Sequence, residues 1–497
     1  MARWLLLTLV AALVASAASA VDLTFGAEGE TGWDSNVVNF DNGPSSWVGK
    51  IGPTVKVEEP QGDLTYELSY RARYDAFYDL HALDGWEHYA NLNGSYRLSE
   101  ATKIRFGNLF QFLPVGSTQL QNVTDINNQP VPGQVNSVFG QNRVLVNSAS
   151  ATLSHNFSPL WLTEAQLSND YYDPRGEGQV SSVTTLGQGS LLYQMARTDQ
   201  LGLGVGVTAQ KFLATDNRAS THTEYYNVYG IWRHDFSPTL NLSVQAGPTL
   251  VDAGSQDVTA TTVVVPFLAQ SIDSSGRSGR TALYSSCQDV GGVARFDTCT
   301  ANVGLTELGR NANATVPLSA SDLAGGGLEV TYFANIALTQ SWETVSARIG
   351  YSRSASNQGG FSTSSVLDAV TGTVTWEPTE LWTIALTALW SQRESVSKGI
   401  DPNLSKSLFV SPFFFSGATE AVTASQSVVL RSRNINVQNY LVSLRVDRRI
   451  WKRLTVYGSF LYNYQNQGDT FQTASGSYDA KRINLGVRYE FDPIQLF

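Results

Sequence analysis

The chain has 497 residues and a formal net charge of −10, with 42% hydrophobic but only 15% charged residues. An acidic chain is a poor partner for nucleic acid, because neutralising phosphates requires a basic surface, and we expect no nucleic-acid partner. After Val21 no run reaches the roughly 18 consecutive apolar residues of a membrane-spanning helix, so helical membrane spans are not predicted.

Residues 1–20 have the pattern of a secretory signal peptide. Arg3 gives a positive start, Trp4 to Val14 is apolar, and Ala18-Ser19-Ala20 is a small-residue cleavage site. We therefore expect an exported protein whose mature chain begins at Val21, with residues 21–497 forming one domain.

Alternation over Leu64 to Leu80 is the strongest structural signal. Even positions carry Leu, Tyr or Ala, and odd positions other than Phe77 are polar or charged. Period two indicates a β-strand with one apolar and one wet face, and this run is about three times the usual strand length of roughly 5–6 residues. Such strands are typical of an outer-membrane β-barrel; a long strand of a soluble β-sandwich is the alternative.

Similar runs follow along the chain, joined alternately by tight and long connections. They predict an all-β, antiparallel up-and-down transmembrane barrel of about 18 strands, with about 16 as the alternative. Tight turns are expected at the periplasmic end and long loops outside the cell. The predicted tight turns, rich in Pro, Ser, Asp and Gly, are Glu59–Asp63, Ser99–Ala101, Ser158-Pro159, Arg197–Asp199, Ser237-Pro238, Gln340-Ser341, Glu377–Thr379 and Arg448-Arg449.

Tryptophan positions give an independent indication of a barrel. All the tryptophans after Val21 fall near predicted strand ends, where aromatic girdles meet the two membrane interfaces. Those near tight turns are Trp161, Trp232, Trp342, Trp376, Trp382 and Trp451, and those near the opposite ends are Trp33, Trp47, Trp86 and Trp390.

Two long connections stand out, over about 254–325 and about 394–425. The first contains Cys287 and Cys299, for which an exported protein predicts one disulfide; a metal site is the weaker interpretation, since no further Cys or His lies nearby. Connections this long usually have a function. The first is expected either to fold inward as a constriction or plug, or to cap the extracellular mouth. The second carries an apolar cluster, Leu408–Phe415, that could bind a partner or pack against other loops.

The last predicted strand, Ile483 to Phe491, alternates apolar residues and ends in an aromatic. It resembles the C-terminal signal read by the outer-membrane barrel-assembly machinery, which we expect as a partner together with outer-membrane lipid. Because Asp492–Phe497 follows, either Phe491 or Phe497 could be the terminal aromatic.

The first strand carries the clearest family resemblance. Glu28 is followed by Trp33-Asp34-Ser35-Asn36-Val37, which resembles the aromatic-Asp-x-Asn-Val opening of the outer-membrane β-barrel porin family. The order of strands that follows, to about Phe112, is also similar. The resemblance implies the bacterial outer membrane more firmly than it implies transport, because some members are encoded with exopolysaccharide systems. It brings no catalytic residues.

Charged residues on the polar face of the strands are the candidate functional residues. Arginines and acids that face a wet lumen would select solutes by charge; alternatively they pair with one another and brace the wall, and the two roles are compatible. The candidates are Glu67, Arg71, Arg73, Asp75, Arg97, Arg105, Arg233, Arg348, Arg445 and Arg488. Glu28 and Glu30 on the first strand are also expected to face inward by parity.

Enzyme signals are weak. The five histidines are scattered, and no metal-ligand pair, nucleophile elbow or phosphate-binding loop is present in the sequence. We predict neither catalysis nor a cofactor. A channel for passive diffusion of small hydrophilic solutes is the leading functional hypothesis, because barrels of about 16–18 strands can enclose an aqueous path. The alternative is a barrel with a loop-closed lumen that serves surface polysaccharide export, surface attachment or reception. Homo-oligomerisation stays open.

Overall fold

The computed structural model describes residues 21–37, 43–113, 143–175, 181–213, 221–253, 328–356, 365–395, 436–466 and 477–496, together with eight short strands between residues 262 and 429. The predicted signal peptide, Cys287 and Cys299 lie outside the described residues. Among these residues no helix is long and apolar enough to cross a membrane.

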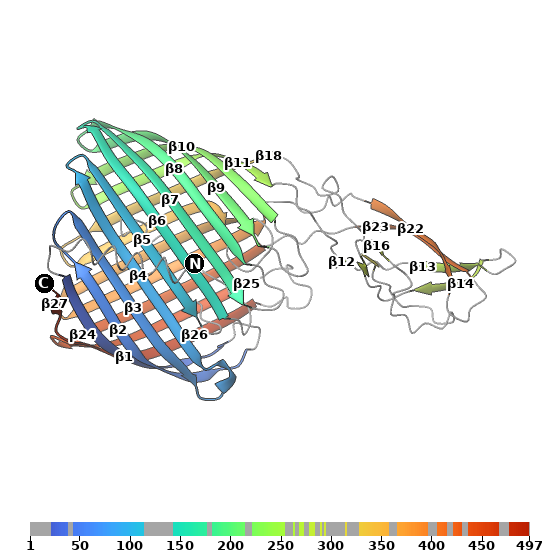
Figure 1. Cartoon of the computed structure of the whole chain (residues 1–497), viewed down its shortest axis with the longest axis horizontal. Coiled ribbons are helices and arrows are strands. Elements are labelled where there is room, and N and C mark those ends of the chain that lie inside the picture. The colour runs from blue at the N-terminus through green and yellow to red at the C-terminus, as the bar shows by residue number, and fades with distance from the viewer. Residues whose placement is uncertain are drawn as a thin grey trace.

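Eighteen long antiparallel strands form one closed barrel (Figure 1). Each strand pairs with the next along the chain, and β26 pairs with β1 from Gly26↔Glu490 to Asp34↔Arg482. The predicted strand number is thereby confirmed and the sixteen-stranded alternative is excluded. The strands are β1 Val21–Asp34, β2 Ser46–Glu59, β3 Leu64–Phe77, β4 Gly85–Ser99, β5 Thr102–Leu113, β6 Arg143–Ser158, β7 Trp161–Arg175, β8 Ser182–Ala196, β9 Asp199–Phe212, β10 Thr221–Ser237, β11 Leu240–Ala253, β18 Leu328–Ser341, β19 Val345–Ser356, β20 Ser365–Thr379, β21 Trp382–Ser395, β24 Asn436–Trp451, β25 Leu454–Asn466 and β26 Ser477–Glu490.

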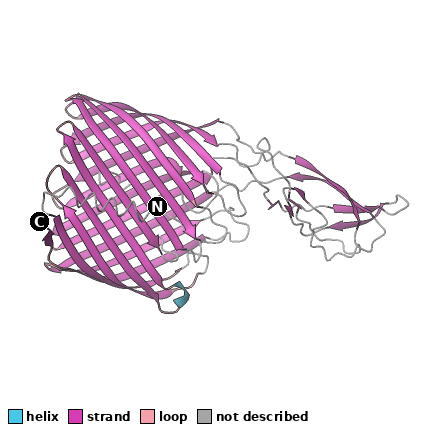
Figure 2. Ribbon diagram, in the orientation of Figure 1, coloured by secondary structure: helices cyan, strands magenta, loops and turns pink. Residues whose placement is uncertain are grey.

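Connections at the two ends of the barrel differ in length, as the sequence predicts. Short turns join the strands at the end taken as periplasmic, and the longer connections all lie at the other end. Figure 2 shows how completely strands make up this wall, with one turn of 3-10 helix, His81–Leu83, at the extracellular rim.

Six of the tight turns share one construction. A β-bulge lies just before the last residue pair of the hairpin, and a two-residue loop follows that pair. This arrangement is seen at Asn156/Ser158 and Asp235/Ser237, and it recurs at the ends of β4, β8, β20 and β24. Three turns lie a few residues later in the chain than the sequence predicts: those predicted at Gln340-Ser341, Glu377–Thr379 and Arg448-Arg449. At Glu377–Thr379, for example, Pro378 lies in the bulge, and the chain turns at Glu380 and Leu381.

The outer face of the barrel is apolar. Side chains from alternate positions, such as Leu203, Ile349 and Leu485, are more than half exposed on it. Trp47 and Trp86 are exposed near the extracellular end of the wall, and Trp342 and Trp451 near the periplasmic end. A closed sheet with an apolar belt between two aromatic girdles is the form that strands take in an outer membrane, since closure leaves no sheet edge in the lipid.

The inner face is mainly polar, with apolar clusters near the extracellular end. Phe77, the exception to the alternation of β3, is buried there with Val37, Val48 and Leu83. Val144, Val146 and Tyr172 form another cluster, and Ala369, Leu389 and Leu441 a third.

Two Gly-Pro pairs bring neighbouring strands unusually close. A Cβ on Gly52 of β2 would lie 1.7 Å from the Ala72 carbonyl oxygen, and one on Gly247 of β11 would lie 1.9 Å from the Val228 oxygen. The prolines that follow, Pro53 and Pro248, have no N–H for the ladder. Both pairs therefore sit where strand pairing is interrupted, and only glycine fits.

The two long connections pair with each other. Leu268–Ile272 (β13) pairs with Ser278–Leu283 (β14) and with Ala421–Val429 (β23), and β23 pairs with Ser405–Phe414 (β22). Figure 1 shows these strands beyond the extracellular end of the barrel rather than inside it. The described part of these connections is thus not a plug.

Candidate functional site

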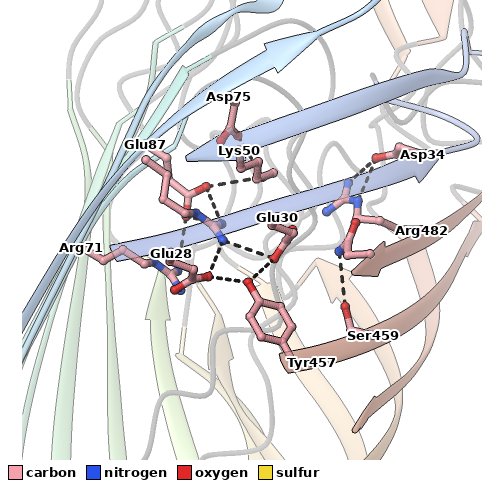
Figure 3. Close-up of polar contacts among 12 residues, drawn as sticks. Glu28, Glu30, Asp34, Lys50, Arg71, Asp75, Glu87, Tyr457, Ser459 and Arg482 are labelled. Carbon is pink, nitrogen blue, oxygen red and sulfur yellow. Dashed lines mark hydrogen bonds and ion pairs between the residues drawn. The ribbon is translucent and has the colours of Figure 1, made fainter. Parts of the chain in front are cut away.

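The densest polar cluster on the inner wall spans β1 to β4. Its members are brought into line by register, which places Glu30 opposite Lys50, Lys50 opposite Asp75, and Arg73 opposite Glu87. We call this the β1–β4 cluster; it consists of Glu28, Glu30, Lys50, Arg71, Arg73, Asp75, Glu87 and Tyr457. Figure 3 shows its contacts, with all of these residues but Arg73 labelled.

Arg73 is the centre of the β1–β4 cluster. Its Nη2 donates to both oxygens of Glu87 at 3.1 and 3.0 Å, and its Nη1 donates to Glu28 at 3.2 Å and to Glu30 at 3.5 Å. Arg73 is 6% exposed and Glu87 only 1%. Loss of either partner would leave a lone buried charge in the wall, which is costly, so this part of the wall depends on both partners being present.

The remaining cations of the β1–β4 cluster are also paired. Lys50 Nζ donates to Asp75 at 2.9 Å and lies 3.6 Å from Glu87. Arg71 lies 3.8 Å from Glu28 and 3.5 Å from Glu87, but its side chain is 28% exposed, against 7% for Arg73. Arg71 is therefore the cation of this cluster that faces the solvent of the lumen.

Tyr457 of β25 connects the β1–β4 cluster to the other side of the junction between β1 and β26, where the barrel closes. Its hydroxyl, on a strand two places away from β1, lies 2.7 Å from a Glu28 oxygen and 2.9 Å from a Glu30 oxygen and shares its one hydrogen between them. The ring crosses Gly486 of β26, where a Cβ would lie 2.2 Å from it. Arg445 donates two hydrogen bonds of 2.8 Å to Asp447. Its guanidinium carbon lies 4.2 Å from the centre of the same Tyr457 ring.

The residues of the first-strand motif join β1 to β26. Arg482 donates to Asp34 at 2.9 and 2.5 Å. Beyond the last paired residues, Ser35 N donates to the Lys481 carbonyl at 2.9 Å, and the Asn36 amide donates to the Asp479 carbonyl at 3.2 Å. The motif that carries the family resemblance thus closes the barrel.

The opposite wall, β7 to β11, is built mainly from amides, hydroxyls and glycines. Gln188 donates to Gln166 at 2.5 Å and Thr249 to Asn227 at 2.6 Å. Arg233 of β10 reaches Glu164 of β7 at 2.8 Å across two intervening strands. It can do so because the inward positions of β9 between them include Gly202, Gly204 and Gly206.

A cavity of about 850 Å³ lies inside the barrel and is lined by residues from β2 to β11 and from β18 to β20. Most of the side chains that face it are uncharged and polar. They include Asn91, Asn93, Ser150, Gln166, Gln188, Thr208, Tyr225, Asn227 and Thr249.

The other predicted residues are spread along the wall. Glu67 pairs with Lys56 at 3.2 Å and, like Arg105, lines the cavity. Arg97 pairs with Asp63 at the periplasmic rim, where both are more than 60% exposed. Arg348 faces inward on β19, opposite Thr373. Arg488 lies 3.2 Å from Glu490. The structure gathers Arg71, Arg73 and Asp75 in one cluster, joins Arg445 to it through Tyr457, and places Arg488 opposite Glu28 of the cluster. The other predicted residues lie outside it.

Three members of the β1–β4 cluster escape the sequence prediction. Glu87 and Lys50 follow the period-two pattern of their own strands, and the parity used for β3 could have found them. Nothing in the sequence marks Tyr457 beyond its place in an alternating run. Among the described residues no group of three or more His, Cys, Asp or Glu is arranged to hold a metal ion.

No protein-family model and no curated protein matches the chain. Similar solved structures include OccK2 (OpdF) of Pseudomonas aeruginosa, at 8% identity and a TM-score of 0.37, covering 95% of this chain and 98% of that one. The outer membrane protein OpdK of the same organism, at 8% identity and a TM-score of 0.36, covers 95% and 98%. The siderophore receptor PirA of that organism, at 11% identity and a TM-score of 0.37, covers 94% and 80%.

No residue role is transferred from these structures. The closed strand ladder, the exposed apolar belt and the polar interior identify the setting of this protein by themselves. The chain is an eighteen-stranded β-barrel of the bacterial outer membrane.

Proposed function

We propose that this barrel is a non-enzymatic channel for passive diffusion of small hydrophilic solutes. The cavity of about 850 Å³ inside the barrel supports this proposal, because it is lined mainly by amide and hydroxyl groups. Such groups exchange hydrogen bonds with a passing polar solute and hold it only weakly, as conduction requires.

The pairing of charges on the wall bears on which solutes would pass. Arg73 and Asp75 are buried against opposite charges, so their fields in the lumen are largely cancelled. Arg71 is more exposed and retains influence on passing ions. We therefore propose a channel with weak charge preference, in which most of the predicted selectivity residues brace the wall.

Planar-bilayer recording of the refolded protein tests this function. We expect stable conductance steps with weak ion preference in a salt gradient, and swelling of vesicles that contain the barrel in small neutral sugars. Absence of both from a barrel with strand-rich circular dichroism and heat-modifiable gel migration would contradict the proposal.

Surface attachment or reception is the second candidate function. It is favoured by the four-stranded sheet β14-β13-β23-β22, which both long connections build together beyond the barrel. If conductance is absent, deletion of residues 405–429 should abolish cell-surface binding of polysaccharide while the barrel still folds.

A further inference from the structure

Strand pairing stops part-way up the wall between β18 and β19. Their register runs from Ser341↔Ser346 to Ala334↔Arg353, and the described residues beyond it, up to Ser356 on β19, are not paired across this junction. Yet β18 stays paired with β11 up to Leu328, and β19 with β20 up to Ser356. The two strands therefore separate into a fork above Ala334 and Arg353, while the wall on either side stays intact.

The fork lies at membrane depth. Eight residue pairs separate it from the periplasmic turn. At about 3.4 Å per residue and a tilt of about 40°, it stands about 20 Å above that turn. The apolar band of such barrels is about 25 Å tall, so the fork opens towards the outer leaflet rather than into the loops.

An unpaired strand edge at this depth requires polar partners. Backbone N–H and C=O groups facing hydrocarbon cost several kcal/mol each, and irregular backbone persists there only where it lines a wet cavity or is covered. Water from the lumen, or the polar part of a bound molecule, must therefore serve the facing edges of residues 331–333 and 354–356.

The cavity inside the barrel reaches the fork. Its lining includes three consecutive residues from each edge, Thr331–Phe333 and Arg353–Ala355. Tyr332 is 51% exposed on the outer face, while Phe333 packs 5.2 Å from the Tyr229 ring inside. The cavity therefore borders both edges of the fork.

Polar side chains flank the fork on its outer side. The Arg353 guanidinium stacks 4.4 Å from the centre of the Tyr332 ring across the gap, and it pairs with Asp368 of β20. Tyr351 donates to Asp368 at 2.7 Å, and its hydroxyl lies 3.4 Å from that of Tyr332. These four residues, which we call the fork cluster, place hydroxyl and charged groups beside an otherwise apolar belt.

We propose that the fork is a lateral opening that admits an amphiphile from the outer leaflet, with an uncharged, hydroxylated head group and an alkyl chain. The head lies in the amide- and hydroxyl-lined cavity and meets the unpaired edges, and the chain stays in the bilayer beside Tyr332 and Val330. Charge on the head is not required, because the Arg353 cation is already matched by Asp368. This proposal goes beyond channel function and does not depend on axial conductance.

Two serines test the opening directly. Ser352 lies just below the fork and is paired with Asn335, whereas Ser354 lies just above it; both share the inward parity of β19. In a Cys287→Ser/Cys299→Ser background, Ser352→Cys and Ser354→Cys are labelled separately with a small fluorophore in lipid vesicles. We expect iodide to quench both labels, and lipids with brominated chains to quench the label at 354 at least threefold more strongly. Equal quenching by brominated lipid at both positions would overturn the lateral opening.

A photoactivatable dodecyl maltoside tests the ligand class on the unlabelled protein in vesicles. Cross-linked peptides should map to residues 328–333 and 353–356. Excess dodecyl maltoside should compete, but maltose, which lacks the chain, and dodecylphosphocholine, which lacks the sugar, should not. Ser354→Trp should reduce cross-linking at least tenfold, and Ser352→Trp should leave it unchanged. Equal competition by dodecylphosphocholine, or no effect of Ser354→Trp, would refute the proposed ligand class. Conductance recorded in parallel separates this outcome from failure of the channel proposal.

Discussion

The barrel has two junctions that differ sharply in their extracellular halves. Where β26 meets β1, pairing runs to Asp34↔Arg482, and the side chains of Ser35 and Asn36 continue the bonding beyond it. Where β18 meets β19, pairing ends at Ala334↔Arg353 and only side chains of the fork cluster bridge the gap. Closure of the barrel is therefore not its weakest junction. The opening lies within a continuous hairpin, where topology alone would favour full pairing.

The largest expected effect lies beside the tightly closed junction. Arg73→Gln removes the buried cation that contacts all three of Glu28, Glu30 and Glu87, and a broken buried ion pair costs about 3–5 kcal/mol. Unfolding by guanidinium in lipid vesicles, followed by tryptophan emission, should show a loss of this size. The control Arg97→Gln, in an exposed pair, should cost at most about 1 kcal/mol. Equal losses would show that the β1–β4 cluster is not a brace.

Asp34→Asn weakens the closed junction itself. It removes the carboxylate that accepts two hydrogen bonds from Arg482, and hydrogen bonds to charged groups contribute about 1.5–3 kcal/mol. The same unfolding measurement should report a loss in this range. Hydrogen exchange should rise in β1 and β26 before it rises elsewhere. Unchanged exchange there would mean that backbone pairing alone closes the barrel.

Asp368→Asn makes the matching change at the fork. Asp368 is 15% exposed, against 4% for Asp34, and the opening beside it admits water, so its ion pair should contribute less than the contacts of Asp34. We expect a smaller loss of stability than for Asp34→Asn, with stronger quenching of a label at Ser354 by brominated lipid. A loss as large as that of Asp34→Asn would indicate that the two junctions are held equally firmly.

The smallest effect concerns ion preference. Arg71→Gln should shift the reversal potential of single channels by a few millivolts towards cations, because Arg71 retains exposure to the lumen. A conservative Arg73→Lys variant, which keeps the buried charge, is the matched control and should leave the reversal potential unchanged. If Arg73→Lys shifts the reversal potential more than Arg71→Gln does, the buried ion pair of Arg73, rather than Arg71, sets the ion preference.

Alternation and tryptophan placement were sufficient to predict the strand number, the two girdles and the asymmetry of the connections. These features depend on each residue's own environment, lipid or water, which the sequence records locally. Contacts within the β1–β4 cluster depend on register between strands, and Tyr457 lies 429 residues from Glu28. The fork was not predictable either, because Thr331–Phe333 alternate like residues in any paired strand.

The first-strand motif lies between these cases. Asp34 and Asn36 stood out by resemblance, but their role became clear only once Arg482 and Asp479 were placed beside them. Period-two parity gave the inward direction of Arg71, Arg73 and Asp75, and left open which of them would be buried. Burial there follows from Lys50 and Glu87 on the flanking strands.

The two Gly-Pro pairs have a mechanical consequence. The contacts of Gly52 and Gly247 lie between β2 and β3 and between β10 and β11, on nearly opposite sides of the ring. Each interruption spans only two residue pairs, so the wall lacks cross-strand pairing at two opposed points, where it is expected to bend first under lateral pressure. The lumen of this barrel would then widen or narrow with membrane tension while every strand keeps its neighbours.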